Sequence, residues 1–170
     1  MSAHSFHSRS VSETLAIGCA LGRILTEASD PGLVIALDGP LGAGKTVFVK
    51  GLAEGLGVAP EYVSSPTFVI AQRYEGPRLR LHHIDLYRIE VEDELDGFGY
   101  YELLDPPDIT AVEWSSRFPQ SLPVDRLDVS IERTGDDAEG RRFDVTSGGP
   151  RSQHELDAWR VALEGHSASG

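Results

Sequence analysis

Apolar and polar positions follow helical spacing in the first part of the chain and strand-like runs further on. After Ser10, apolar residues recur on one face of a helix, at positions 17, 21, 24, 25 and 28. Ser10 and Glu13 fit a capping box, so a helix is predicted from there to about Ala28. The continuous apolar run 33–37 is typical of a strand buried on both faces.

A glycine-rich turn at 39–44 follows this strand, and a helix is predicted from Lys45 to about Leu56. Strand, glycine-rich turn and helix together are typical of the opening of a parallel α/β sheet. Further elements are predicted in this order: strands at 68–71 and 79–86 around the turn 75–78, short helical pieces at 90–95 and 100–104, a strand at 109–112, a half-exposed strand at 127–131 and its hairpin partner at 142–146.

These elements predict one domain over residues 1–147, in which residues 1–9 form a short flexible tail. Residues 148–170 are predicted to be a linker and a C-terminal helix, which Ser152 and Glu155 could cap. The length of 170 residues suits a single compact domain.

Composition and charge exclude several classes of protein. The longest apolar stretches are about five residues, whereas a membrane helix needs about 20. We expect no secretory signal, because residues 1–10 are polar and contain no apolar stretch. The one cysteine excludes an internal disulfide and a cysteine-based zinc site. We therefore expect a cytoplasmic protein with no membrane contact. The net charge of −12 disfavours tight nucleic-acid binding by this chain alone.

The most specific motif is the octapeptide 39–46, which fits the phosphate-binding pattern G-x-x-x-x-G-K-[ST]. Its residues are Gly39, Pro40, Leu41, Gly42, Ala43, Gly44, Lys45 and Thr46. Glycines let the loop turn its backbone N–H groups inward around phosphates, at the positive end of the following helix. Lys45 would face the β- and γ-phosphates, and the Thr46 hydroxyl would ligate Mg²⁺. The predicted fold class is therefore P-loop NTPase-like α/β, with a mainly parallel central sheet, flanking helices and a C-terminal antiparallel hairpin.

Phosphoryl transfer also needs a carboxylate near the metal and a group that orients the nucleophile. Asp85 and Glu113 each stand at the end of an apolar strand, where ligands gather in α/β sheets. The alternative is that both are ordinary surface acids. His82 and His83 adjoin Asp85, but consecutive strand residues face opposite ways, so structural histidines are favoured over a metal trio.

Two further features concern the nucleotide. Ser65, Pro66 and Thr67 lie where P-loop proteins often keep a nucleotide-sensing switch, although a plain turn is the alternative. Guanine recognition by an N-K-x-D motif is absent, because the chain has no asparagine. ATP is therefore favoured over GTP.

Several of these pieces occur together in one known family. The chain resembles the bacterial TsaE (YjeE) family from about Thr14 to Val145, in the motifs 39–46, 65–67, H-x-D-L-Y-R at 83–88 and V-E-W at 112–114. The family consists of small P-loop ATPases required for threonylcarbamoyl modification of adenosine in tRNA.

The resemblance implies a role for each matching residue. Thr46 and Glu113 would hold Mg²⁺, and Asp85 would activate or orient water. The segment 65–67 would be the switch, and Trp114 would lie beside the site and respond to nucleotide. Thr14 and Arg141 would also lie near the nucleotide. The implied partners are proteins of the TsaB and TsaD types, with tRNA reached only indirectly through that complex.

Two other functions fit part of the sequence. A small-molecule P-loop kinase would usually carry an arginine-rich lid, whereas the arginines between Thr110 and Gly140 are widely spread. A nucleotide-gated regulatory module without physiological turnover would have less need of Asp85. Phosphate release from ATP would distinguish these possibilities.

Overall fold

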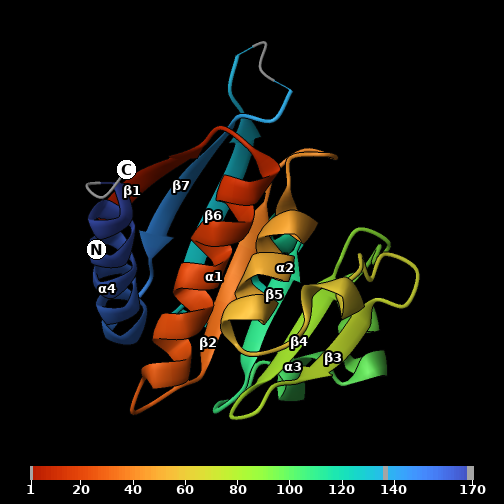
Figure 1. Cartoon of the computed structure of the whole chain (residues 1–170). Helices are drawn as coiled ribbons and strands as arrows, with labels where there is room; N and C mark the ends of the chain where they lie inside the picture. The colour runs from red at the N-terminus through yellow and green to blue at the C-terminus, as the bar shows by residue number, and fades with distance from the viewer. Residues whose placement is uncertain (1, 136–137, 168–170) are drawn as a thin grey trace.

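The apolar run that follows the first helix forms the central strand of a sheet with helices packed against it (Figure 1). The computed structural model describes residues 2–135 and 138–167. Its strands are β1 (Ala3–Ser8), β2 (Leu33–Asp38), β3 (Ala71–Glu75), β4 (Arg80–Asp85), β5 (Ile109–Glu113), β6 (Leu127–Arg133) and β7 (Arg141–Ser147). Its α-helices are α1 (Val11–Glu27), α2 (Lys45–Gly55), α3 (Tyr100–Leu103) and α4 (Pro150–Ser167), and four 3-10 turns are also described, at Pro60–Tyr62, Glu92–Phe98, Ser115–Arg117 and Pro119–Ser121.

The described strands form one sheet of seven in the order β1-β7-β6-β2-β5-β4-β3. The four central strands, β6, β2, β5 and β4, run parallel to one another. β7, β1 and β3 add to the outside in antiparallel fashion, and β6–β7 is the expected hairpin. The predicted fold class is confirmed: a mainly parallel core flanked by helices, with an antiparallel hairpin near the C-terminus.

The core lies on both faces of this sheet. On one face, α1, α2 and α4 cover apolar side chains such as Ile35, Leu37 and Val129. The opposite face packs Val34, Ile84 and Val112 against the segment around α3. β2 is apolar until Asp38, and its parallel neighbours β5 and β4 end in Glu113 and Asp85, so the three acids lie at the same end of these strands. The polar residues there are therefore concentrated at one edge of the sheet.

Helices α1 and α2 pack unusually closely, because glycines face one another across their contact. A Cβ built on Gly51 would lie 2.1 Å from the carbonyl oxygen of Leu15, and one on Gly18 would lie 2.3 Å from that of Phe48. Backbone therefore meets backbone at this contact. α2, which begins at the phosphate loop, is held firmly against the rest of the domain.

The C-terminal helix is packed into the same core. Trp159 is fully buried and donates its indole N–H to the carbonyl of Ile17 at 2.9 Å. Its ring packs at a tilt against the rings of Phe6 and Phe48. The helix begins at Pro150, ahead of the expected cap. Asp125, from the loop before β6, accepts the backbone N–H groups of Arg151 (3.0 Å) and Ser152 (2.9 Å) at this end.

Two sequence predictions of local structure are wrong. Residues 3–8 were expected in a flexible tail, but they form β1, an edge strand paired with β7 along its whole length. The strand expected at 68–71 begins only at Ala71, because Pro66 accepts hydrogen bonds from Val69 and Ile70 in a turn. Among the described residues, no helix is long and apolar enough to span a membrane.

Candidate nucleotide and metal site

The glycine-rich loop connects β2 to α2, and its backbone requires glycine. Gly39 has φ of +148°, and a Cβ there would lie 2.3 Å from the carbonyl oxygen of Ile131 on β6. Gly44 is the N-cap of α2 and adopts φ of +106°, in the left-handed region. Other residues rarely adopt these conformations. The loop therefore curves around the N-terminus of α2, where backbone N–H groups and the helix dipole favour an anion.

Lys45 is the first residue of α2, and its ammonium group folds back onto the loop. Its Nζ donates to the carbonyl oxygens of Gly39 (2.5 Å) and Pro40 (3.1 Å), and lies 4.3 Å from the ring centroid of Trp114. Burial lowers the pKa of Lys45 below its usual value, although the nearby carboxylates of Glu113, Asp85 and Asp38 act in the opposite direction. The loop carbonyls thus hold a cation that a phosphate could attract.

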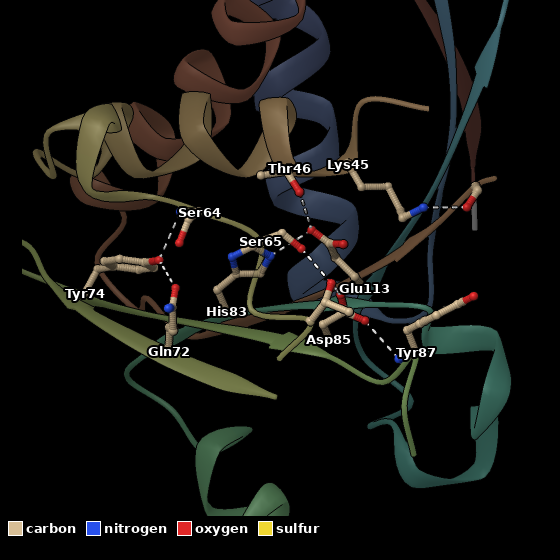
Figure 2. A network of polar contacts seen from close by, with 12 residues as sticks. Lys45, Thr46, Ser64, Ser65, Gln72, Tyr74, His83, Asp85, Tyr87 and Glu113 are labelled. Carbon is tan, nitrogen blue, oxygen red and sulfur yellow. Dashed lines mark hydrogen bonds and ion pairs between the residues drawn. The ribbon is translucent and has the colours of Figure 1, made fainter. Parts of the chain in front are cut away.

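Thr46, Glu113 and His83 form a chain of hydrogen bonds below the loop (Figure 2). The Thr46 hydroxyl donates to Oε1 of Glu113 at 3.2 Å, and His83 Nε2 lies 2.8 Å from the same oxygen. Glu113 is 3% exposed and His83 is fully buried. Because the proton of Thr46 is directed at Glu113, the lone pairs of its oxygen remain free for a cation.

This donor set fits Mg²⁺. A hydroxyl, a carboxylate and phosphate oxygens are the ligands that Mg²⁺ takes in nucleotide sites, where it keeps several waters. In the described part of the chain, no group of three or more His, Cys, Asp or Glu side chains could hold a metal ion. A metal bound here would therefore need the phosphates of a nucleotide as further ligands, with Thr46 and Glu113 as the protein's contribution.

Asp85 lies beside Glu113, since β4 and β5 are parallel and the two residues are register partners. Both oxygens of Asp85 are engaged: Oδ2 accepts from the Thr67 hydroxyl at 2.6 Å, and Oδ1 accepts from the backbone N–H of Tyr87 at 2.9 Å. The hydroxyls of Thr67 and Ser65 lie 2.8 Å apart. The expected switch segment 65–67 is thus tied directly to the expected water-orienting acid.

The backbone is strained on both sides of this pair of acids. Ile70, just after the switch segment, has φ of +68°, and Trp114, just after Glu113, has φ of +58°. Positive φ is rare for such side chains and usually marks a constrained or functional segment. Trp114 is held with its ring 5.0 Å from that of Tyr87. Thr67 contacts Asp85, and Trp114 lies beside Lys45, so both strained segments adjoin the site.

Arg141 contacts the outside of the phosphate loop, and Thr14 is linked to it indirectly. The guanidinium of Arg141 donates to the carbonyls of Ala43 (2.6 Å) and Gly42 (3.3 Å). Arg141 pairs with Ser8 across β1 and β7, and the hydroxyls of Ser8 and Thr14 lie 2.7 Å apart. The structure therefore brings Arg141 to the loop, whereas buried Thr14 is linked to it through Ser8 and Arg141.

Two polar residues of the site were not assigned a role by sequence reasoning. His83 was treated as structural, yet it contacts Glu113, while His82 on the opposite face contacts Asp108 at 2.8 Å. Asp38 ends β2 and accepts hydrogen bonds from Ser115 and Ser116, which fixes the turn that carries Trp114. Its position directly before the glycine-rich loop was the signal that could have identified it.

The chain matches one known protein family. The family model for "Threonylcarbamoyl adenosine biosynthesis protein TsaE" matches residues 8–143. The chain belongs to the TsaE family. It is 41% identical over 133 residues to the tRNA threonylcarbamoyladenosine biosynthesis protein TsaE of Bacillus subtilis (strain 168), covering 74% of this chain and 82% of that one.

A second TsaE protein, from Treponema pallidum (strain Nichols), is 39% identical over 129 residues, covering 76% of this chain and 91% of that one. A crystal structure of YdiB from Bacillus subtilis superposes with a TM-score of 0.73 at 32% identity, covering 94% of this chain and 95% of that one. The TsaE resemblance stated from the motifs is therefore confirmed, and so is the fold.

Proposed function

We propose that this TsaE-family chain is a Mg²⁺-dependent ATPase that acts in the threonylcarbamoyl modification of adenosine in tRNA. One observation carries the proposal: Thr46 and Glu113 meet at 3.2 Å below the glycine-rich loop, with Asp85 on the adjacent strand. This combines a phosphate cradle, oxygen ligands for Mg²⁺ and an acid able to orient water at one edge of the sheet. Lys45 would exchange its loop carbonyls for the β- and γ-phosphates.

The roles of the two acids follow from their neighbours. Oε1 of Glu113 accepts a hydrogen bond from the Thr46 hydroxyl, which suits a group in or next to the metal shell. Asp85 contacts the switch residue Thr67 instead, which suits a group that meets the attacking water once the switch has moved. Asp85 would therefore be released for catalysis only when nucleotide or a partner changes the segment 65–67.

This arrangement predicts slow turnover by the chain alone. With Lys45 bonded to loop carbonyls and both Asp85 oxygens engaged, the described conformation is not set for hydrolysis. The same observation favours the second candidate, a nucleotide-gated regulatory module. We place turnover under the control of proteins of the TsaB and TsaD types. The net charge of −12 supports contact with tRNA only through that complex.

The test is phosphate release from ATP by the chain alone and with a TsaB–TsaD pair, together with partner affinity in ATP, in ADP and without nucleotide. We expect the pair to accelerate turnover and ATP and ADP to give partner affinities that differ by roughly 5–150-fold. Nucleotide-dependent partner binding without any phosphate release would identify the regulatory module. A phosphorylated metabolite in a substrate screen would identify a kinase. Equal partner affinity in all three states would refute the proposed coupling.

A further inference from the structure

His83 lies on the same face of β4 as Asp85 and on the α2 side of the sheet. It is register partner to Ala111 on β5, one alternation before the pair Asp85–Glu113. Its side chain is fully buried and its Nε2 lies 2.8 Å from Oε1 of Glu113. Figure 2 shows the imidazole ring directed at this carboxylate from below the helix that carries Thr46.

The hydrogen bond between His83 and Glu113 holds one oxygen of the carboxylate in place. An ionised carboxylate only accepts hydrogen bonds, so Nε2 of His83 must be the donor. Oε1 of Glu113 then receives two donors, His83 Nε2 and the Thr46 hydroxyl. Among the described residues, Oε2 of Glu113 receives no hydrogen bond, and Figure 2 shows the second oxygen pointing away from His83. One oxygen is held in place, and the other is available to a cation or its water.

The preceding residue, His82, also pairs with a carboxylate, but that pair lies outside the site. His82 is 6% exposed and its Nε2 lies 2.8 Å from Oδ2 of Asp108, on the opposite face of the sheet. Both histidines make this contact through Nε2 at the same distance. The two carboxylates differ in their surroundings: Asp108 is partly exposed and also lies 3.7 Å from Arg80, whereas Glu113 is buried and also accepts a hydrogen bond from Thr46.

The second nitrogen of His83 argues against a purely structural role. Nδ1 is a buried polar atom without a hydrogen-bond partner among the described residues. Leaving such an atom unpaired is costly, and an apolar side chain at this position would avoid the cost. What a histidine provides at this position, and an apolar side chain would not, is the hydrogen bond from Nε2 to Glu113.

We propose that His83 is a positioning residue: it orients Glu113 so that this carboxylate and Thr46 together receive Mg²⁺ when nucleotide is bound. The inference rests on the proposed function, because it needs a metal–nucleotide complex at this site. Groups behind a metal ligand typically change metal affinity or activity by about 10–100-fold when they are removed.

The experiment compares variants that differ in where they place an N–H group. His83→Gln can put its amide near the position of Nε2, whereas the shorter His83→Asn can reach only the position of Nδ1. His82→Asn, on the opposite face, is the matched control. Mn²⁺ binding to the full chain in the presence of ADP is followed by electron paramagnetic resonance, and ADP affinity without metal is measured by calorimetry.

We expect His83→Asn to weaken Mn²⁺ binding by about 10-fold or more while metal-free ADP affinity stays unchanged. His83→Gln should recover most of that loss, and His82→Asn should bind Mn²⁺ as the parent does. If His83→Asn does not fold, His83→Leu takes its place, because it removes both nitrogens without burying an amide.

Three results would overturn the inference, and they can be told apart. Mn²⁺ affinity equal to that of the parent in folded His83→Asn or His83→Leu would refute the role of His83 alone. A parent chain that binds ADP equally with and without Mn²⁺ would refute the proposed metal–nucleotide site, and this inference with it. An equal loss in His82→Asn and His83→Asn would show that the effect is a general consequence of disturbing β4.

Discussion

Asp85 and Glu113 stand side by side at the carboxyl ends of β4 and β5, as register partners of two parallel strands. They are 28 positions apart in sequence, and each has a different neighbour: Thr67 for Asp85, Thr46 for Glu113. Two carboxylates in one site with different partners are suited to different tasks. This relationship is the basis of the first prediction.

Asp85→Asn and Glu113→Gln are expected to fail in different ways. If Glu113 belongs to the metal shell, its amide should weaken Mg²⁺-dependent ATP affinity. If Asp85 orients water, its amide should leave ATP bound but block turnover. Single-turnover kinetics with separately measured ATP affinity test both variants. An equal loss of binding in the two would mean that the roles are shared or reversed.

Lys45→Ala should abolish hydrolysis and greatly weaken nucleotide binding, because it removes the cation expected to face the β- and γ-phosphates. Lys50, in the same helix, provides a control through Lys50→Ala, which leaves the phosphate loop intact. Steady-state phosphate release and calorimetric ATP binding are the measurements. Hydrolysis near the parental rate in a folded Lys45→Ala protein would disprove the site.

Trp114 should report nucleotide binding through its fluorescence. Lys45 Nζ lies 4.3 Å from its ring centroid, and transfer of this ammonium to bound phosphates would change the environment of the indole. The chain has one other tryptophan, Trp159, which is fully buried in the core. We expect an emission change on adding ATP with Mg²⁺ that disappears in Trp114→Phe. A change that persists in this variant would assign the signal to Trp159.

Gly51→Ala should destabilise the domain, because the new Cβ would lie 2.1 Å from the carbonyl oxygen of Leu15. Overpacking of this kind typically costs about 1–3 kcal/mol. In a chain of this length, each kcal/mol lowers Tm by roughly 2–4 °C. Gly97→Ala is the control, since nothing lies within 4 Å of its added Cβ. Thermal unfolding of both variants by circular dichroism should show a clear loss for Gly51→Ala alone.

Asp125 should make stability depend on pH in the acid range. Partial burial opposes its ionisation, but hydrogen bonds from Ser152 and Arg151 outweigh this effect and lower the pKa of its carboxyl. A lowered folded pKa means that the stabilisation is complete above the unfolded pKa of about 3.9 and is lost as pH falls through the folded pKa. Asp125→Ala should cost about 0.5–2 kcal/mol at pH 7.

Urea unfolding of the parent and of Asp125→Ala at several pH values between 7 and 2.5 measures this difference. We expect the gap in unfolding free energy to stay constant down to about pH 5 and to narrow below it. Asp125→Asn keeps one acceptor oxygen and should fall between the two. A gap that does not change over the whole range would contradict the assignment of the carboxylate as the cap of α4.

The phosphate loop, the strands and helices around it, and the family could be recognised in the sequence alone, because each depends on local chemistry. The glycines at fixed spacing before Lys45 and Thr46 can be recognised from neighbouring residues alone, and so can the apolar run at 33–37. Asp85 and Glu113 could be singled out because each follows a predicted strand, and ligands gather at the carboxyl ends of strands in α/β sheets.

Other features depend on residues that are distant in sequence. The residues of the edge strand β1 are mostly polar, so they carry no apolar periodicity that would predict a strand. The strand is defined by its backbone pairing with β7. The turn at 66–70 replaces an expected strand, because the backbone N–H groups of Val69 and Ile70 bond to Pro66, and the pairing of β3 with β4 begins only at Ala71.

His83 shows most clearly which features depend on local sequence and which depend on the tertiary structure. The sequence by itself determined that His82 and His83 face opposite ways, because side chains alternate along a strand. Only the tertiary structure decided that one of them meets Glu113 and the other Asp108. The partner depends on which strand lies alongside and in which register. That pairing is set by long-range packing of the whole sheet, which no local pattern around residue 83 encodes.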